Sequence, residues 1–116
     1  MATLSQIRVV GSQIGTAFDA EKVILFGSHS RGRAGPDSDV DLLVVMPVKG
    51  KAFRQAAEIL SATRAPFPLD ILVRSPRSVQ QRLAMGDCFM RDVIDKGVVV
   101  YEAQATRSRV GRKGRR

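Results

Sequence analysis

Apolar residues recur at helical spacing in three segments of the chain, and each of these segments predicts a helix. Thr3 can cap the first helix, because Gln6 stands at the position that completes a capping box. Gly86 can divide the third helix in two. The helical segments are residues 3–18, about ten residues from Ala52, and residues 79–96.

Short unbroken runs of aliphatic residues lie between the helical segments and predict strands, the first of them buried on both faces. Gly27 ends the first run and Pro47 ends the second. The order helix, strand, strand, helix, strand, helix, strand predicts an α/β (α+β) domain with helices packed on a small mixed sheet. The four runs are Val23–Phe26, Val40–Met46, Leu69–Val73 and Val98–Tyr101.

Positive charge is concentrated at the end of the chain, which has 116 residues and a formal net charge of +8. Six of the last ten residues are Arg or Lys, and without these six the net charge falls to +2. A chain of this length suits one domain, so we expect a folded domain at residues 1–104 and a basic, disordered tail at residues 105–116. The tail either has no specific role or contacts nucleic acid or an acidic partner.

Several classes of protein are disfavoured by what the sequence lacks. No apolar run approaches the roughly 20 residues that cross a bilayer, and residues 1–8 show no secretory signal, so we expect a cytoplasmic protein. Cys88 is the single cysteine, which excludes an internal disulfide and a cysteine zinc site. We expect Cys88 to be buried in a helix beside Phe89.

The first strand ends in Gly27-Ser28, at the start of a loop rich in Gly, Ser, Arg and Pro that reaches Ser38. A glycine turn lets an anion approach the backbone, and Ser28 adds a hydroxyl group. If a helical turn begins there, its free N–H groups would face the same point, and together these groups could hold a phosphate. The alternative is a plain loop after a strand.

Asp39 and Asp41 stand two residues apart at the start of the second strand. Residues at this spacing point to one face of a strand, with their Cα atoms about 6.6 Å apart. Two such carboxylates repel each other and are costly to desolvate, and a divalent cation removes that conflict. The alternative is a solvated strand entrance, or ion pairs with Arg31 or Arg33.

Asp70 interrupts the third apolar run, where an aliphatic residue would suit a buried strand better. A lone aspartate at a strand end is more often a cap or a turn residue. Together with Asp39 and Asp41, however, Asp70 predicts a site for two Mg²⁺ or Mn²⁺ ions, because oxygen ligands suit these ions and not zinc.

The pattern Gly27-Ser28, ten residues, then Asp39-Val40-Asp41 resembles the signature of the minimal nucleotidyltransferases (MNT-type antitoxins). These proteins belong to the DNA polymerase beta-like nucleotidyltransferase superfamily. Asp70, in an apolar strand downstream, is similar to the third carboxylate of the family. The resemblance covers about residues 18–102. The smaller matches are Arg31-Gly32, Ser38, Leu42-Leu43-Val44 and residues 93–102.

One position departs from the resembled family pattern, and another lies where that pattern is variable. Ser30 stands where alanine is common, and His29 occupies a variable position. We read His29, the only histidine, as a loop residue rather than a proton carrier.

The resemblance implies a polymerase beta-like fold and a magnesium-dependent nucleotidyl transfer. A nucleoside triphosphate would bind with its phosphates near Gly27 and Ser28, and Arg31 is the nearest candidate to neutralise their charge. Three carboxylates would hold two Mg²⁺ ions, and the third of them, in the strand downstream, could also act as a base. The implied metal ligands and catalytic residues are Asp39, Asp41 and Asp70.

Short members of the resembled family are often antitoxins that transfer AMP from ATP to a tyrosine of a HEPN-type toxin, an RNase. This chain has little length for an acceptor-binding domain, so we expect the same role here, with a HEPN-type toxin as partner in a hetero-oligomer. Two alternatives stay open: a catalytically silent module that sequesters a partner, and a nucleic-acid-binding protein that uses the basic tail. The absence of stacking aromatic residues outside the folded body weakens the second alternative.

Overall fold

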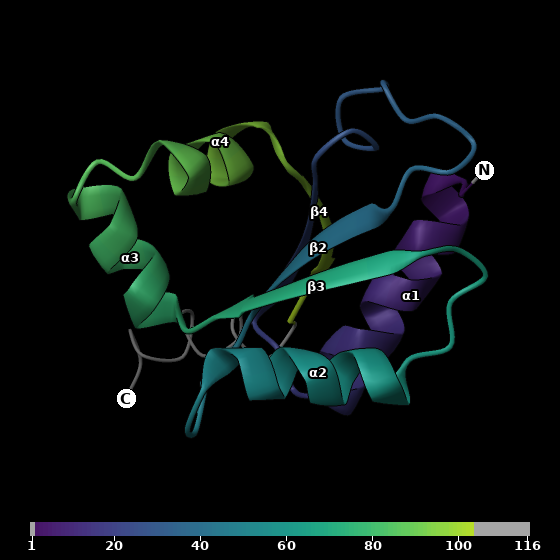
Figure 1. The fold of residues 1–116 in the computed structure, drawn as a ribbon. Coiled ribbons are helices and arrows are strands. Elements are labelled where there is room, and N and C mark those ends of the chain that lie inside the picture. Colours follow the sequence, from purple (N-terminus) through teal and green to yellow (C-terminus); the bar gives the residue numbers. More distant parts are fainter. Residues whose placement is uncertain (1, 104–116) are drawn as a thin grey trace, which may run out of the picture.

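A four-stranded sheet lies between two layers of helices in the computed structural model, which describes residues 2–103 (Figure 1). The predicted α/β architecture and all four predicted strands are confirmed, while the basic tail lies outside the described residues. None of the helices within residues 2–103 is both long and apolar enough to cross a membrane. The elements are α1 (Leu4–Ala17), β1 (Lys22–Phe26), β2 (Val40–Val45), α2 (Ala52–Ala62), β3 (Leu69–Arg74), α3 (Pro76–Ala84), α4 (Cys88–Lys96) and β4 (Val98–Glu102).

The strands are arranged in the order β3-β2-β1-β4. β2 and β3 run parallel, whereas β1 is antiparallel to both β2 and β4. Helix α2 connects β2 to β3 and returns the chain to the edge where β2 began, as a parallel connection requires. The starts of β2 and β3 and the end of β1 therefore lie at the same edge of the sheet.

Alternate strand residues face the two helical layers. Val23, Leu25 and the even-numbered residues of β2 belong to a core that α1 and α2 cover. Ile24 and the odd-numbered Leu43 and Val45 belong to a second core, which α3 and α4 cover. Leu42, Leu43 and Val44 are each 0% exposed, so β2 is buried on both faces and forms the centre of the sheet.

Two helix starts follow the signals in the sequence. The Thr3 hydroxyl oxygen accepts the N–H of Gln6 at 3.1 Å, and the Gln6 side-chain oxygen accepts the N–H of Thr3 at 3.0 Å, so the predicted capping box is confirmed. At α3, the Ser75 hydroxyl oxygen accepts the N–H of Ser78 at 3.0 Å, and Pro76 occupies the first helical position.

The two glycines of α1 allow this helix to approach β4 closely. A β-carbon at Gly11 would lie 2.6 Å from the Cγ2 atom of Val100, and one at Gly15 would lie 2.6 Å from the Cγ atom of Tyr101. Glycine lowers helix propensity, but here it lets the backbone of α1 pack directly against the strand.

The third predicted helix is divided in two at Gly86, which has a φ of 80°. Helix α4 then begins after Asp87, whose Oδ1 atom accepts the N–H of Met90 at 2.9 Å. The expectation that Cys88 is buried is wrong, because the side chain is exposed. Met90 and Val93 face the sheet, and Cys88, two positions before Met90, points to the opposite side of the helix.

Replacing Gly15 with Ala should destabilise the protein by about 1–3 kcal/mol, because the new methyl group overlaps the Tyr101 ring. On an exposed helix face the same change would stabilise by up to about 1 kcal/mol. Chemical denaturation measures the effect, with Ser12→Ala on the exposed face of α1 as the control. Adding Tyr101→Val should recover part of the loss. A stabilised Gly15→Ala protein would contradict the packing explanation.

Candidate active site

Three strands meet at one edge of the sheet, and their ends carry the predicted site residues. Asp41 of β2 is the register partner of Asp70 of β3 and of Phe26, the last residue of β1. Register partners on adjacent strands point to the same face of a sheet. The fold therefore places Asp41 and Asp70 side by side, on the face that α3 and α4 cover.

Asp41 is half-buried, and its surroundings raise the pKa of its carboxyl group above the ordinary value of 3.8. Burial is the largest cause, followed by the charge of Asp70 and a hydrogen bond between the two carboxyl groups. The charge of Asp39 acts in the same direction, and His29 acts weakly against it. The pair therefore concentrates negative charge at a place where water compensates it only in part.

Asp39, the third predicted ligand, precedes β2 and is exposed. Within residues 2–103, no three His, Cys, Asp or Glu side chains are already arranged to hold a metal ion, so Asp39 does not complete a three-carboxylate cluster with the close pair as it stands. Its exposed side chain can rotate toward Asp41 without leaving a packed environment. The carboxylate oxygens of Asp39, Asp41 and Asp70 are donors of the type that Mg²⁺ prefers.

The alternative in which Arg31 or Arg33 neutralises these acids does not hold. No Lys or Arg in the described part of the chain forms an ion pair with Asp39, Asp41 or Asp70. A bound cation would thus compensate charges that protein side chains leave uncompensated.

Gly27 lies against Asp41 and has a φ of 77°. A β-carbon at this position would clash with the Oδ2 atom of Asp41. Only glycine combines this backbone conformation with such close contact to the carboxylate. The turn after β1 therefore lies directly against Asp41 of β2.

The loop after Gly27 consists of successive turns rather than the helical turn considered from the sequence. The carbonyl oxygen of Ser28 accepts the N–H groups of Arg31 and Arg33 at 3.2 and 2.9 Å. The backbone N–H groups of Ser28 and His29 donate to no acceptor among residues 2–103. These two donors, beside Gly27, could bind a phosphate oxygen.

His29 and Arg31 hold the loop in place from both sides. The Nε2 atom of His29 lies 3.3 Å from the carbonyl oxygen of Ser38, at the far end of the loop, in accord with a loop role. Arg31 forms an ion pair with Asp92 of α4, and Asp92 also pairs with Lys96 at 3.3 Å. The hydrogen bond with Lys96 and the charge of Arg31 lower the pKa of Asp92. Arg31 would reach a bound phosphate only by releasing Asp92.

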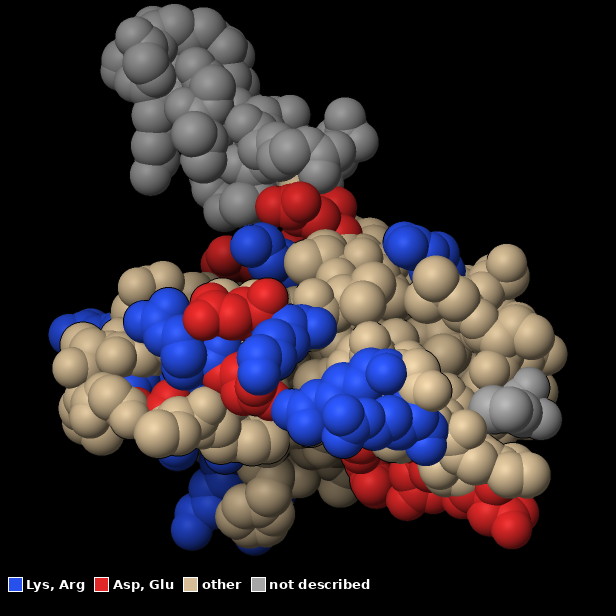
Figure 2. Space-filling model, turned by 90° about the horizontal axis from the view of Figure 1, so that it is seen from above, with Lys and Arg blue, Asp and Glu red and all other residues tan. Residues whose placement is uncertain are grey.

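Charged side chains of both signs share the surface near α4 and the site loop. In the view from above, Lys and Arg side chains alternate with Asp and Glu and form no single basic face (Figure 2). This distribution agrees with a net charge of +2 once the six basic residues at the chain end are left out.

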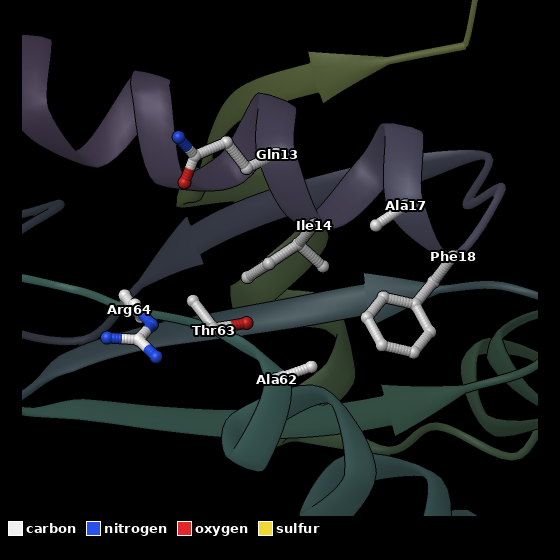
Figure 3. Close-up of a pocket in the computed structure, with 7 residues that line it drawn as sticks. All are labelled: Gln13, Ile14, Ala17, Phe18, Ala62, Thr63 and Arg64. Carbon is white, nitrogen blue, oxygen red and sulfur yellow. The ribbon is translucent and has the colours of Figure 1, made fainter.

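The hollow between α1 and the end of α2 is a weaker candidate site. It has a volume of about 350 Å³ and lies on the face of the sheet opposite the acids. Figure 3 shows its lining, in which Arg64 is the single charged residue. The hollow offers no pair of acid and base groups, so the chemistry is better placed at the Asp41 edge.

A comparison with protein-family models identifies the family of this chain. The model of the nucleotidyltransferase domain matches residues 7–116. The chain belongs to this family. The match includes every predicted site residue of this nucleotidyltransferase domain and confirms the resemblance to the polymerase beta-like superfamily.

Two solved structures resemble the nucleotidyltransferase domain at low sequence identity. A protein of Sulfolobus solfataricus, assigned as a nucleotidyltransferase, has a TM-score of 0.61 and 20% identity over 87% of this chain and 81% of that chain. A toxin-antitoxin structure with AMP-PNP has a TM-score of 0.49 and 17% identity over 87% of this chain and 76% of that chain. The first supports the fold, and the second is too distant to support an argument. The search of curated proteins gives no match.

The position of α4 beside the loop of the candidate site was not evident from the sequence. Asp92 reaches Arg31 across 61 residues, and Phe89 contacts Phe26 across a similar separation. The segment has an ordinary helical pattern, and no local signal indicates which of its exposed residues face the loop.

Replacing Asp41 with Asn should raise the free energy of unfolding at neutral pH when divalent ions are absent. The folded protein binds the Asp41 proton more tightly than the unfolded chain does, so the unfolding free energy falls as pH rises through the raised pKa. The gain should be complete above that pKa and disappear below pH 3.8, where both states are protonated. Urea denaturation with a chelator, repeated across pH, measures it.

Asp92→Asn is the matched control. Its effect on the free energy of unfolding should have the opposite sign, because Lys96 and Arg31 lower the pKa of Asp92. This variant should lose stability at neutral pH, and the loss should disappear as pH falls through the lowered pKa. If Asp41→Asn instead lost stability at neutral pH, as Asp92→Asn should, the repulsion proposed between Asp41 and Asp70 would be contradicted.

Gly27→Ala should disturb the acidic pair as well as the turn, because the methyl group overlaps the Asp41 carboxylate. Gly50 is a matched control, since it has a φ of 80° and open space around it. Gly50→Ala should lower the free energy of unfolding by about 1–2 kcal/mol, the cost of the backbone conformation alone, and Gly27→Ala should lower it further. NMR titration should show a changed Asp41 pKa in Gly27→Ala alone. Equal losses of stability in the two variants, with an unchanged Asp41 pKa in Gly27→Ala, would contradict the close contact between Gly27 and Asp41.

Proposed function

We propose that this nucleotidyltransferase domain transfers a nucleoside monophosphate, AMP from ATP, to a hydroxyl group of a protein partner. The observation that carries the proposal is the register of Asp41 with Asp70 beside the Gly27 turn. Two adjacent carboxylates without an ion-pair partner in residues 2–103 suit a cation and a phosphate ester. A surface that only bound a partner would gain no stability from two acids that repel each other.

Phosphate binding is assigned to the turn after β1. Gly27 lets a phosphate approach the backbone, and the N–H groups of Ser28 and His29 would donate to its oxygens. Arg31 would add positive charge after it exchanges Asp92 for the phosphate. Because Arg31 is an exposed residue, this exchange costs little free energy.

Mg²⁺, when bound, offsets the negative charge of the phosphates and lowers the pKa of the acceptor hydroxyl. Asp39 and Asp41 would hold one ion, and Asp70 would join them in holding a second. The donor set consists of carboxylates alone, which agrees with this ion and with Mn²⁺.

The transfer exchanges one phosphorus–oxygen bond for another. The acceptor oxygen bonds to the α-phosphorus of ATP, and the bond from that phosphorus to the bridging oxygen of pyrophosphate breaks. The hydroxyl proton passes to the carboxylate of Asp70. Asp70 is exposed, whereas Asp41 is half-buried, so Asp70 is the more accessible base for an acceptor that arrives from solvent.

The partner we propose is a HEPN-type toxin, an RNase, with one of its tyrosines as the acceptor. The resemblance of the segment from Gly27 to Asp41 to MNT-type antitoxins supports this choice. The exposure of Asp39 and Asp70 supports it further, because a tyrosine that projects from another protein can reach an open strand edge.

Incubation with ATP, Mg²⁺ and the HEPN-type toxin proposed as partner should add the mass of AMP to that toxin. Asp41→Asn and Asp70→Asn should each lower the rate by more than about 100-fold, because they remove proposed metal ligands. Asp37→Asn, an exposed acid in the same loop, should keep full activity. Mass spectrometry of the partner over time measures the transfer.

Two outcomes would contradict the proposal. A folded chain that leaves its partner unmodified would exclude the proposed acceptor. Neutralisation of the partner that survives Asp41→Asn would indicate the silent binding module instead.

A further inference from the structure

Two phenylalanine rings stand next to the acidic pair on the face that α3 and α4 cover. Phe26 is the register partner of Asp41, so their β-carbons lie about 5 Å apart. Phe89, in the first turn of α4, meets the Phe26 ring edge to face, with ring centroids 5.6 Å apart and an angle of 84° between the planes. The aromatic pair thus extends from the acids toward α4.

Phe89 is 52% exposed although its side chain is large and apolar. Phe26 is partly buried against the apolar core of this layer and anchors the contact. Phe89 therefore keeps part of its ring surface open to solvent. A ring held in this way can take another flat group against it.

The helix that carries Phe89 is tied to the phosphate-side loop. Asp92 follows Phe89 by three residues, so the two side chains share one face of α4. Asp92 pairs with Arg31, after the Gly27 turn, while Phe89 contacts Phe26, just before it. Helix α4 thus holds both flanks of the turn and sets the position of the exposed ring relative to it.

The other aromatic rings lie elsewhere in the fold. Phe18, Phe67 and Tyr101 pack with the core under α1 and α2, on the opposite face of the sheet. Phe53 is on α2, which covers that same face. Phe89 is thus the half-exposed ring on the face that carries the acids.

We infer that Phe89 forms the stacking surface for the purine base of the nucleoside triphosphate, an inference that rests on the proposed nucleotidyl transfer. With the phosphates at the Gly27 turn, a base that extends toward α4 covers the open part of the Phe89 ring. A phenyl ring offers overlap but no hydrogen bond to a base. Phe89 therefore favours purines over pyrimidines and does not distinguish adenine from guanine.

Binding of two probes to the full chain, with Mg²⁺, tests the inference by calorimetry. One probe is α,β-methylene-ATP, which resists transfer at the α-phosphorus, and the other is inorganic tripolyphosphate. Phe89→Ala should weaken binding of the nucleotide analogue about 5- to 100-fold and leave tripolyphosphate binding unchanged. Phe89→Trp should restore the affinity. Phe53→Ala removes a ring that is 66% exposed on the opposite layer, and it should leave the affinity for both probes unchanged.

The outcomes separate this inference from the function on which it rests. Unchanged binding of the analogue by Phe89→Ala would overturn the inference. Equal weakening of both probes would also overturn it, because Phe89 would then act by supporting the phosphate turn. If the unaltered chain binds both probes with equal affinity, base stacking is excluded while the phosphate seat stands. If it binds neither probe, the proposed function fails, and the inference fails with it.

Discussion

The register of the central strand β2 forces two carboxylates together, and the candidate site depends on this constraint. Leu42 and Val44 are buried on one face of the sheet and Leu43 on the other. A shift of one residue would exchange the faces of β2 and turn Asp41 toward the core under α1 and α2. Burial of these aliphatic side chains, worth about 1.5–3 kcal/mol each, offsets the repulsion between Asp41 and Asp70. The packing of the neighbouring β2 residues thus keeps the two carboxylates together despite their repulsion.

Close contacts between backbone and neighbouring elements explain several glycines better than turn chemistry does. Gly15 lets α1 approach Tyr101, and Gly27 leaves room for the Asp41 carboxylate in addition to its positive φ. Gly97, where α4 ends, has a φ of −71°, but a β-carbon there would collide with β1. The helical layers and the site loop therefore rest on contacts that any side chain would push apart.

Helix α4 contacts the candidate site both through an ion pair and through an aromatic ring. The Arg31–Asp92 ion pair is exposed and contributes little to stability, so its main effect is to position the loop beside the helix. The Phe26–Phe89 contact adds an apolar link on the other side of the Gly27 turn. A loop held by weak contacts can rearrange as the proposed phosphate binding requires, while Asp41 and Asp70 stay fixed on strands β2 and β3.

The sequence by itself determined the kinds of element and the chemistry available at their ends. Hydrophobic periodicity indicated the helices and strands, the Thr3 capping box followed from local spacing, and the spacing between Gly27 and Asp41 indicated the family. Tertiary structure decided that Asp70 lies beside Asp41, that Asp39 does not complete a metal-binding cluster with them, and that Cys88 faces solvent. Periodicity and turn chemistry depend on nearby residues along the chain. Distances between distant residues depend on strand register and helix rotation, which are fixed only when the core packs.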